Sequence, residues 1–320
     1  MRGLVMLVLL LLLTPTAAKG QALQMPAAGQ GRLRADHVRY DAKSKAYLAE
    51  GGVRLTLGDV EVRAQRLRLE HESQIAYVFG EVTVRQGDTT LSARTVTYDL
   101  TRKMARALGD PMLSQGGITV RADQMEFDLE KRRTYFLGAV RIAHKDVTVN
   151  TAEMRYDAAA GEAVAPDVVV TQPGRLVRAH RLRYLPEAGR LELDGGVIVE
   201  QESGEHLVQE GVIESPRDDE TQRLLASRAV LTCDRLVILT EERTARAEGN
   251  LTVKQQGRSA SASAAVYADR ERRLTMTGDV VLLDRDGSRL RADVVVISLA
   301  DETVEATGNV VTEFALKPGR

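Results

Sequence analysis

A short phrase that returns about every 29 residues constrains this 320-residue chain more than any other feature of its sequence. The phrase places an alanine before alternating polar and apolar residues, and its first four alanines are Ala35, Ala64, Ala93 and Ala122. Later copies slip by a few residues, but the pattern continues to Ala292. A fixed period of this length indicates repeated structural units, each of which needs its neighbours to bury a core.

A glycine marks the period a second time, at a fixed distance after most of these alanines, as Gly51 follows Ala35. Between the markers the hydrophobic period is close to two, which predicts β-strands. In residues 60–69 the apolar positions change parity between Ala64 and Leu67, so the backbone must bend there to keep one face inward. Glycine suits such a corner because it has no side chain. We therefore expect an all-β fold with about four short strand segments in each unit. The marker glycines are Gly51, Gly80, Gly109, Gly138, Gly195, Gly249, Gly278 and Gly308.

The start of the chain, positions 1–22, predicts a secretory signal peptide. Arg2 supplies a positive start, residues 4–13 form an unbroken apolar run, and small residues offer cleavage sites after Ala18 or Ala22. The run is well short of the roughly 20 residues that span a bilayer. An uncleaved N-terminal anchor is the alternative interpretation. We expect the mature chain to lie outside the cytoplasm.

The composition is that of a folded protein whose core contains few aromatic residues. Hydrophobic residues make up 43% of the chain and charged residues 28%, and there is no Trp. The formal net charge of -1 predicts no long-range attraction to nucleic acid or to an anionic membrane. Cys233 is the single cysteine, so an internal disulfide is excluded and stability must come from burial and backbone pairing.

The repeated phrase resembles that of a known family. It has the form Ala-Asp-x-apolar-x-Tyr-Asp followed by Gly-x-Val-x-apolar, and it occurs here in residues 35–41 with 52–55 and again in 122–128 with 138–142. This pattern resembles the LptA family, also called OstA-like proteins, and the related periplasmic domain of the outer-membrane lipopolysaccharide-assembly protein LptD. The resemblance covers roughly residues 33–312, and the series of copies together with the signal peptide is what makes it specific.

The resemblance implies a curved, open β-jellyroll of about ten repeats, built either as one long roll or as two tandem rolls. It also implies a periplasmic carrier of lipopolysaccharide that needs no cofactor and is not an enzyme. We divide the chain into a signal peptide (1–22), a linker (23–32), a first part of the jellyroll (33–214), a second part (215–312) and a tail (313–320). The polar stretch 215–220 is the best candidate for a break between the two parts.

An apolar groove is the chemistry that such a carrier requires, because each methylene of an acyl chain exposed to water costs about 0.8 kcal/mol. Inward rows of Val, Leu and Ile flanked by charged outward positions would supply it. The alternative is that these residues are simply core. The residues that we expect to line the groove are Val38, Tyr40, Val53, Leu55, Leu67, Leu69, Phe79, Val82, Val84, Val96, Tyr98, Met125, Phe127, Val140 and Ile142.

Two other functions remain open at this point. The chain could be a structural or adhesive β-repeat protein without bound lipid, or a polysaccharide-active β-solenoid that uses paired carboxylates. The units stay regular apart from 215–220, which argues against the second. The five histidines are scattered, so we expect no zinc site. The recurring aspartates lack the glycine-rich nonapeptides of calcium-binding repeats, and we expect them to cap turns.

An open roll leaves an unpaired strand at each end, and unpaired strands invite pairing with another chain. The first repeat, near residues 34–40, and the last repeat, near 304–312, are therefore the expected docking edges. The partners that the resemblance implies are lipopolysaccharide, through lipid A, the inner-membrane export complex and the outer-membrane assembly complex. It further implies head-to-tail assembly of copies of this chain.

Overall fold

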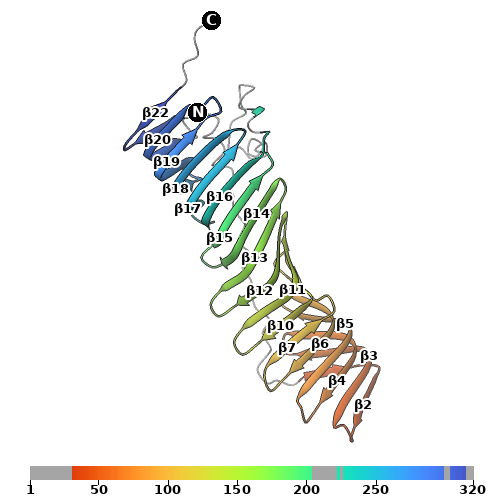
Figure 1. Ribbon diagram of the computed structural model, residues 1–320. Coiled ribbons are helices and arrows are strands. Elements are labelled where there is room, and N and C mark those ends of the chain that lie inside the picture. The colour runs from red at the N-terminus through yellow and green to blue at the C-terminus, as the bar shows by residue number, and fades with distance from the viewer. Residues whose placement is uncertain (1–30, 204–221, 224–225, 299–302, 315–320) are drawn as a thin grey trace. The chain divides into compact units, whose positions relative to one another are not determined.

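The computed structural model describes residues 31–203, 222–223, 226–298 and 303–314 (Figure 1). These residues form 22 β-strands and only two helical residues, 222–223, so the prediction of an all-β fold is confirmed. The signal peptide, most of the linker and the stretch 215–220 lie outside the described residues. No helix within the described ranges is long and apolar enough to cross a membrane.

The chain divides into two compact units. Among the described residues, the first unit holds 31–166 with 185–187, and the second holds 167–184 and everything from 188 onward. The first unit contains β1 Gly31–Arg34, β2 His37–Asp41, β3 Ala46–Leu57, β4 Val60–Glu70, β5 Ile75–Gln86, β6 Thr89–Asp99, β7 Met104–Leu108, β8 Met112–Gln115, β9 Ile118–Arg121, β10 Gln124–Asp128, β11 Arg133–His144 and β12 Val147–Asp157.

Strand β13, Glu162–Gln172, contains the point of division. The remaining strands are β14 Arg175–Leu185, β15 Arg190–Gln201, β16 Ala229–Leu239, β17 Thr244–Gln255, β18 Arg258–Ala268, β19 Arg273–Leu283, β20 Arg289–Ser298, β21 Thr303–Thr307 and β22 Val311–Glu313.

Each repeat folds as an antiparallel pair of long strands with a corner at the middle of each strand. In the first unit, β3 pairs with β4, β4 with β5 and β5 with β6 along nearly their whole lengths. Two short strands take the place of one long strand where the chain breaks at the corner: β7 and β8 both pair with β6, and β9 and β10 both pair with β11. The two halves of each of the two strands make the four short segments that we expect in each repeat.

The marker glycines lie at the corners. The register between β5 and β6 shifts between Phe79 and Val82, on either side of Gly80, and this shift is a β-bulge. Gly80 has φ of 79° and the next residue, Glu81, has φ of 48°, so two consecutive residues take the left-handed conformation. A Cβ atom on Gly80 would also lie 2.8 Å from the Cβ atom of Gln65, so both conformation and space require glycine here.

The same pair of left-handed residues recurs at corners of both units. A residue other than glycine takes the second place in most of them, which is uncommon for such residues and therefore indicates a constrained backbone. These second residues are Glu81, Asp110, Ala139, Asn250, Asp279 and Asn309.

Substitution of a corner glycine is expected to cost more stability than substitution of a turn glycine. Gly80→Ala meets both the left-handed φ and the Gln65 side chain, whereas Gly87→Ala meets a left-handed φ of 57° with no atom within 4 Å. The left-handed conformation costs alanine about 1–2 kcal/mol, and the collision at Gly80 adds to that cost. Denaturant unfolding of the two variants measures the difference; equal losses would show that the corner has room for a side chain.

The apolar inner face of the first unit as a candidate functional site

Strand register defines an inner face in the first unit. Residues that face one another across antiparallel strands point to the same side of the sheet, and along a strand the sides alternate. Nearest the corners, Val53 lies opposite Ala64, and Val82 lies opposite Ala93. Each of these side chains is no more than 9% exposed. We call them, with Val140, the corner row.

The row next to the corner row is fully buried. It crosses the half of each strand that contains Ala49 on β3 and Leu67 on β4. It continues from strand to strand without a polar member, as the pairings Ala49–Leu67, Val78–Val96 and Met125–Phe136 show. In the order of the sheet the row is Ala49, Leu67, Val78, Val96, Ala107, Met125, Phe136 and Met154, and all eight are buried.

Exposure is uneven toward the margins of the inner face, where Val60 and Phe127 remain buried but other residues do not. Beyond the buried row, Leu69 and Tyr98 are half-buried and Tyr47 is 44% exposed. On the other side of the corners, Val84 and Ile142 are half-buried. Burial nevertheless raises the pKa of the Tyr98 hydroxyl above its ordinary value, so this margin is partly desolvated. The inner face is thus buried near the corners and partly exposed at some positions of its margins.

Twelve of the fifteen predicted groove residues lie on the inner face of long or central strands. Val38 and Tyr40 also share this face, since they pair with Ala49 and Tyr47, but they lie on the edge strand β2 and are 54% and 49% exposed. The twelve are Val53, Leu55, Leu67, Leu69, Val82, Val84, Val96, Tyr98, Met125, Phe127, Val140 and Ile142.

Phe79 is the exception, and its predicted inward orientation is wrong. It lies opposite Arg66 and Thr95 on the outer face, where its ring stacks on that of Tyr77 at 6.4 Å between centroids. The prediction placed a change of parity between Phe79 and Val82, as between Ala64 and Leu67, but the bulge at Gly80 leaves an even step between the inward residues Val78 and Val82. The inward residue before the corner is therefore the buried Val78.

The sequence prediction also missed inner-face residues that the period itself would have found. Val62, Leu91 and Val120 follow one another at the repeat spacing and are all buried on the inner face. Val62 and Leu91 lie on the same strands as the predicted Leu67 and Val96, on the other side of the corner. Adding one 29-residue period to the number of an inner-face residue gives the equivalent residue of the next repeat.

The second unit has an inner face of the same kind. Leu193 faces Leu236, Leu251 aligns with Ala262, and Met276 faces Val295; each of these six side chains is at most 8% exposed. Burial raises the pKa of the Cys233 thiol to about 12, so this thiol stays protonated at neutral pH and has little reactivity.

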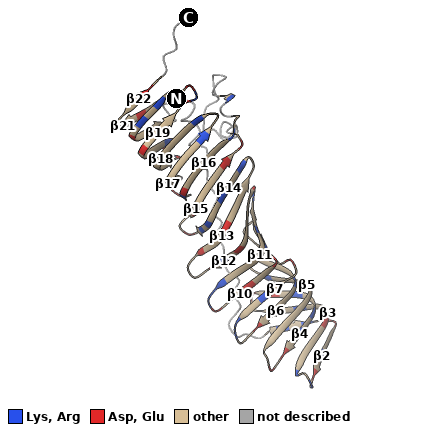
Figure 2. Cartoon of the chain, viewed as in Figure 1, with Lys and Arg blue, Asp and Glu red and all other residues tan. Residues whose placement is uncertain are grey.

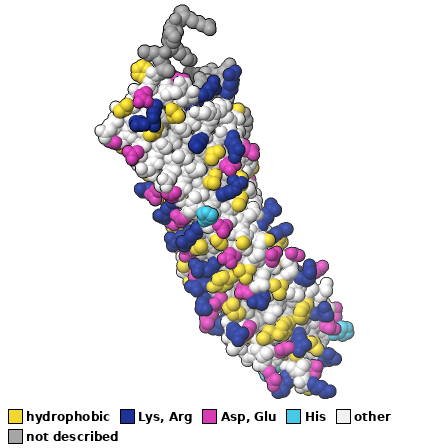
Figure 3. All heavy atoms as spheres, in the orientation of Figure 1, with side chains coloured by type: hydrophobic (Ala, Val, Ile, Leu, Met, Phe, Trp, Pro, Cys, Tyr) yellow, Lys and Arg dark blue, Asp and Glu magenta, His cyan; other side chains and the backbone are white. Residues whose placement is uncertain are grey.

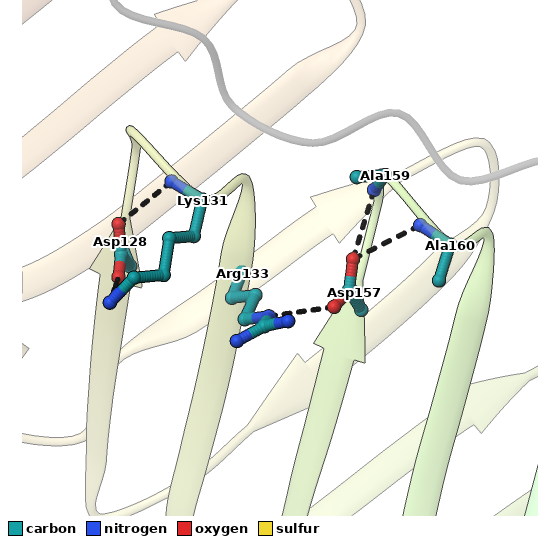
Figure 4. Close-up of polar contacts among 6 residues, drawn as sticks. All are labelled: Asp128, Lys131, Arg133, Asp157, Ala159 and Ala160. Atoms are coloured by element: carbon teal, nitrogen blue, oxygen red, sulfur yellow. Dashed lines mark hydrogen bonds and ion pairs between the residues drawn. The ribbon is translucent and has the colours of Figure 1, made fainter.

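Aspartates at strand ends accept hydrogen bonds from the hairpin turns at one margin of the first unit (Figure 4). The Asp157 carboxylate accepts hydrogen bonds from the backbone N–H groups of Ala159 (3.1 Å) and Ala160 (3.0 Å) and from Arg133 Nε (2.7 Å). Asp128 accepts one from the Lys131 N–H at 2.9 Å. These contacts confirm that the aspartates at strand ends cap turns.

Near the corners the inner face offers mainly hydrophobic contact. The corner row and the buried row beside it carry no charged side chain among the described residues of the first unit. Nowhere in the described ranges do three or more His, Cys, Asp or Glu side chains come close enough to hold a metal ion. Such a surface can shelter apolar chains and hold them by burial.

The fold and this surface define a class of repetitive antiparallel β-proteins with an apolar inner face. Residues 61–190 match the family model described as LptA/(LptD N-terminal domain) LPS transport protein. The resemblance noted in the sequence is thereby confirmed.

Among solved structures, LptH from Pseudomonas aeruginosa is similar, and it is described as the LptA-homologous periplasmic component of the conserved lipopolysaccharide transport device. Its sequence is 18% identical, the alignment covers 33% of this chain and 80% of LptH, and the TM-score is 0.31. No curated protein matches this chain.

Removal of the Asp157 carboxylate is expected to destabilise the protein at neutral pH and not at strongly acid pH. The Arg133 hydrogen bond and the Ala160 N–H hold the pKa of Asp157 below its ordinary value, so its contribution is present at neutral pH and is lost as the pH falls below about 4. Asp157→Asn should cost about 1–2 kcal/mol at pH 7. Asp146→Asn, at an exposed turn position, is the matched control. A deficit that does not shrink on acidification would count against this role.

Proposed function

We propose that this protein is a periplasmic carrier of lipopolysaccharide that shelters acyl chains against its inner face. The observation that carries the proposal is the continuity of that face: every strand of the first unit from β3 to β12 adds apolar residues to it, and some of them, such as Leu69, Val84 and Ile142, are only half-buried. The match of residues 61–190 to the model of a transport family supports the same function.

The energetics favour a long apolar surface over a deep pocket. Neighbouring strands lie about 4.8 Å apart, so the inner face presents an apolar side chain at short, regular intervals along the sheet. An acyl chain laid along it would keep its methylenes out of water, at about 0.8 kcal/mol for each one. Val, Leu, Ala and Ile make shallow contacts that differ little from one repeat to the next, which suits movement along the rows.

Transfer between membranes also needs partners, and the ends of the sheet are where we place them. At the first edge, Val38, Tyr40 and Tyr47 are between 44% and 54% exposed, and the two tyrosine rings lie 4.9 Å apart. At the last edge, Val311 is 52% and Phe314 is 67% exposed. Exposed apolar residues on an unpaired strand favour strand addition from another chain.

The proposed partners are therefore the inner-membrane export complex and the outer-membrane assembly complex, with copies of this chain joined head to tail between them. The periplasmic location rests on the predicted signal peptide. Transport of this kind requires no catalysis or cofactor.

Two other functions are distinguished by simple measurements. A structural or adhesive β-repeat protein would fold normally and carry no lipid A after purification from a lipopolysaccharide-containing cell. A polysaccharide-active β-solenoid would release fragments from cell-surface glycan. Lipid A in the purified protein together with intact glycan supports the carrier.

A charge on the inner face should weaken lipopolysaccharide binding without unfolding the protein. Val84→Asp is a suitable change because Val84 is on the inner face and half-buried, so its carboxylate would meet acyl chains and remain close to solvent. Burial of an unpaired polar group against hydrocarbon costs a few kcal/mol, which predicts at least about a tenfold loss of co-purified lipopolysaccharide.

Thr97 on the adjacent strand β6 supplies the matched control, since it pairs with Tyr77 and points to the outer face. Thr97→Asp should leave the amount of bound lipopolysaccharide unchanged. Equal lipopolysaccharide loss in the two variants, or loss that merely follows a fall in melting temperature, would assign Val84 to the core alone.

A charge at the last edge should prevent end-to-end assembly. Val310 is 48% exposed and immediately precedes the edge strand β22, so Val310→Lys would place an ammonium group in a strand-addition interface. Light scattering at increasing protein concentration measures the assembly. Val266→Lys, at a 37% exposed position of the central strand β18, is the control and should assemble normally. An unchanged mass for Val310→Lys would contradict docking at this edge.

A further inference from the structure

The outer face of the first unit carries a concentration of arginine that the net charge of the chain does not reveal. It lies on the half of the outer face between the corners and the hairpin turns that join β3 to β4 and β5 to β6. Two adjacent rows of outward positions cross β1, β3, β4, β5, β6, β8, β9, β11 and β12 there. We call these two rows the basic face.

The composition of the basic face is unusual. The row nearer the corners reads Arg34, Arg54, Arg63, Thr83, Ser92, Met112, Arg121, Arg141 and Asn150. The row nearer the turns reads Arg32, Thr56, Glu61, Arg85, Thr90, Ser114, Thr119, Ala143 and Thr148. The two rows contain seven arginines, all exposed, and a single acid.

That single acid neutralises only a small part of the charge. Glu61 contacts Arg54 Nε at 3.0 Å and Arg63 Nε at 2.8 Å. The hydrogen bond from Arg63 lowers the pKa of Glu61, with further contributions from Arg54 and Arg85, so one carboxylate is shared among three guanidinium groups.

The remaining arginines face one another or neutral residues. Arg34 lies opposite Arg54, and Arg121 lies opposite Arg141, although facing like charges destabilise a sheet. Arg141 has no acid within ion-pair distance among the described residues. An arrangement that costs stability in the isolated molecule is understandable if an external anion offsets the repulsion.

Acidic residues near this face lie at the hairpin turns, outside the two rows. Asp59 accepts a hydrogen bond from the Gln86 amide at 3.1 Å, and Asp88 accepts one from Gln115 at 3.3 Å. Asp146 lies beside Lys145 in the turn after β11. These acids border the basic face at its margin and leave its centre positive.

The other half of the outer face of the same unit has a different character. Its two rows nearest the corners mix five arginines with three glutamates and add large apolar side chains, among them Tyr77, Phe79 and Leu108. Figure 3 shows hydrophobic side chains among charged ones over the first unit on the side in view.

The corresponding half of the second unit carries less net charge. Its outward positions from β14 to β22 carry Arg178, Lys254, Arg289 and Arg291 against Glu200 and Glu313, and Arg178 forms an ion pair with Glu200 at 2.8 Å. Both signs of charge occur along the strands of both units (Figure 2), so the basic face is a local departure.

We propose that the basic face of the first unit lies against an anionic phospholipid membrane surface. Guanidinium groups bind phosphate oxygens well, and the threonine and serine hydroxyls between them add hydrogen-bond donors. A protein partner fits less well, because protein interfaces are anchored by aromatic and apolar residues, and these two rows hold no aromatic residue and only Met112 as a large apolar one.

Docking in this way goes beyond the carriage of lipid and is compatible with it. The basic face and the inner face are opposite sides of the same strands, so a membrane bound to one leaves the other free. The net charge of -1 does not oppose this contact, because electrostatic forces in physiological salt act over about 8 Å and therefore sense the local arginines.

The test is sedimentation of the protein with lipopolysaccharide-free vesicles, so that its result is independent of the carrier function. The protein is purified after export, and vesicles of phosphatidylcholine with phosphatidylglycerol are compared with vesicles of phosphatidylcholine alone. We expect binding to the anionic vesicles only, and loss of that binding near 1 M salt, where the screening length falls to about 3 Å.

The variant Arg121→Glu with Arg141→Glu reverses two facing charges and keeps their mutual repulsion unchanged. Since each basic residue near an anionic surface contributes about 1 kcal/mol, the double variant should bind anionic vesicles at least about tenfold less tightly. Lys254→Glu with Arg291→Glu makes the same change of charge in the second unit and should bind as the wild type does. Circular dichroism and the melting temperature check that both variants fold.

Three results would overturn the proposal: equal binding to neutral vesicles, equal weakening by the two double variants, or no binding to anionic vesicles. If the protein does not bind anionic vesicles, an acidic protein surface is the partner that fits the charge of the basic face.

Discussion

The rest of the structure depends on the two consecutive left-handed residues at each corner. A β-strand alternates its side chains strictly, so a strand that bends without an extra residue would carry its apolar set to the wrong side. The bulge at Gly80 and Glu81 inserts that residue, and Val78 and Val82 both remain on the inner face as a result. Repetition of this device from one repeat to the next keeps one side of each unit apolar.

Much of this could be predicted from the sequence because the period carries two kinds of marker. The alanines locate the corner on one strand and the glycines locate it on the next, and no other residue type meets the space and φ requirements at Gly51 or Gly80. The all-β fold follows from those markers. So do twelve of the fifteen predicted groove residues, which lie on the inner face of the first unit. The prediction for Phe79 is wrong because it assumes a change of parity at Gly80, whereas the extra residue of the bulge preserves parity between Val78 and Val82.

Other features could not be predicted, because they depend on pairing between strands. The division of the chain falls at Pro166 and Asp167, where the spacing from Gly138 and Gly195 would put another glycine. Asp167 still takes a left-handed φ of 42°, so the corner persists there without its glycine. A departure within a repeat is visible in the sequence, but nothing in the sequence says that compactness changes at that point.

The basic face shows the same limit in another form. Net charge is a property of composition, and it predicts no attraction to a membrane. The arrangement of charge depends on parity and register: Arg34 and Arg54 are well separated in sequence and directly opposite in the sheet. Once the corners fix which residues point outward, one side of the strands must take the apolar residues and the other must take the charges. In the first unit these two consequences of a single alternation provide a surface suited to acyl chains and, behind it, a surface suited to phosphate.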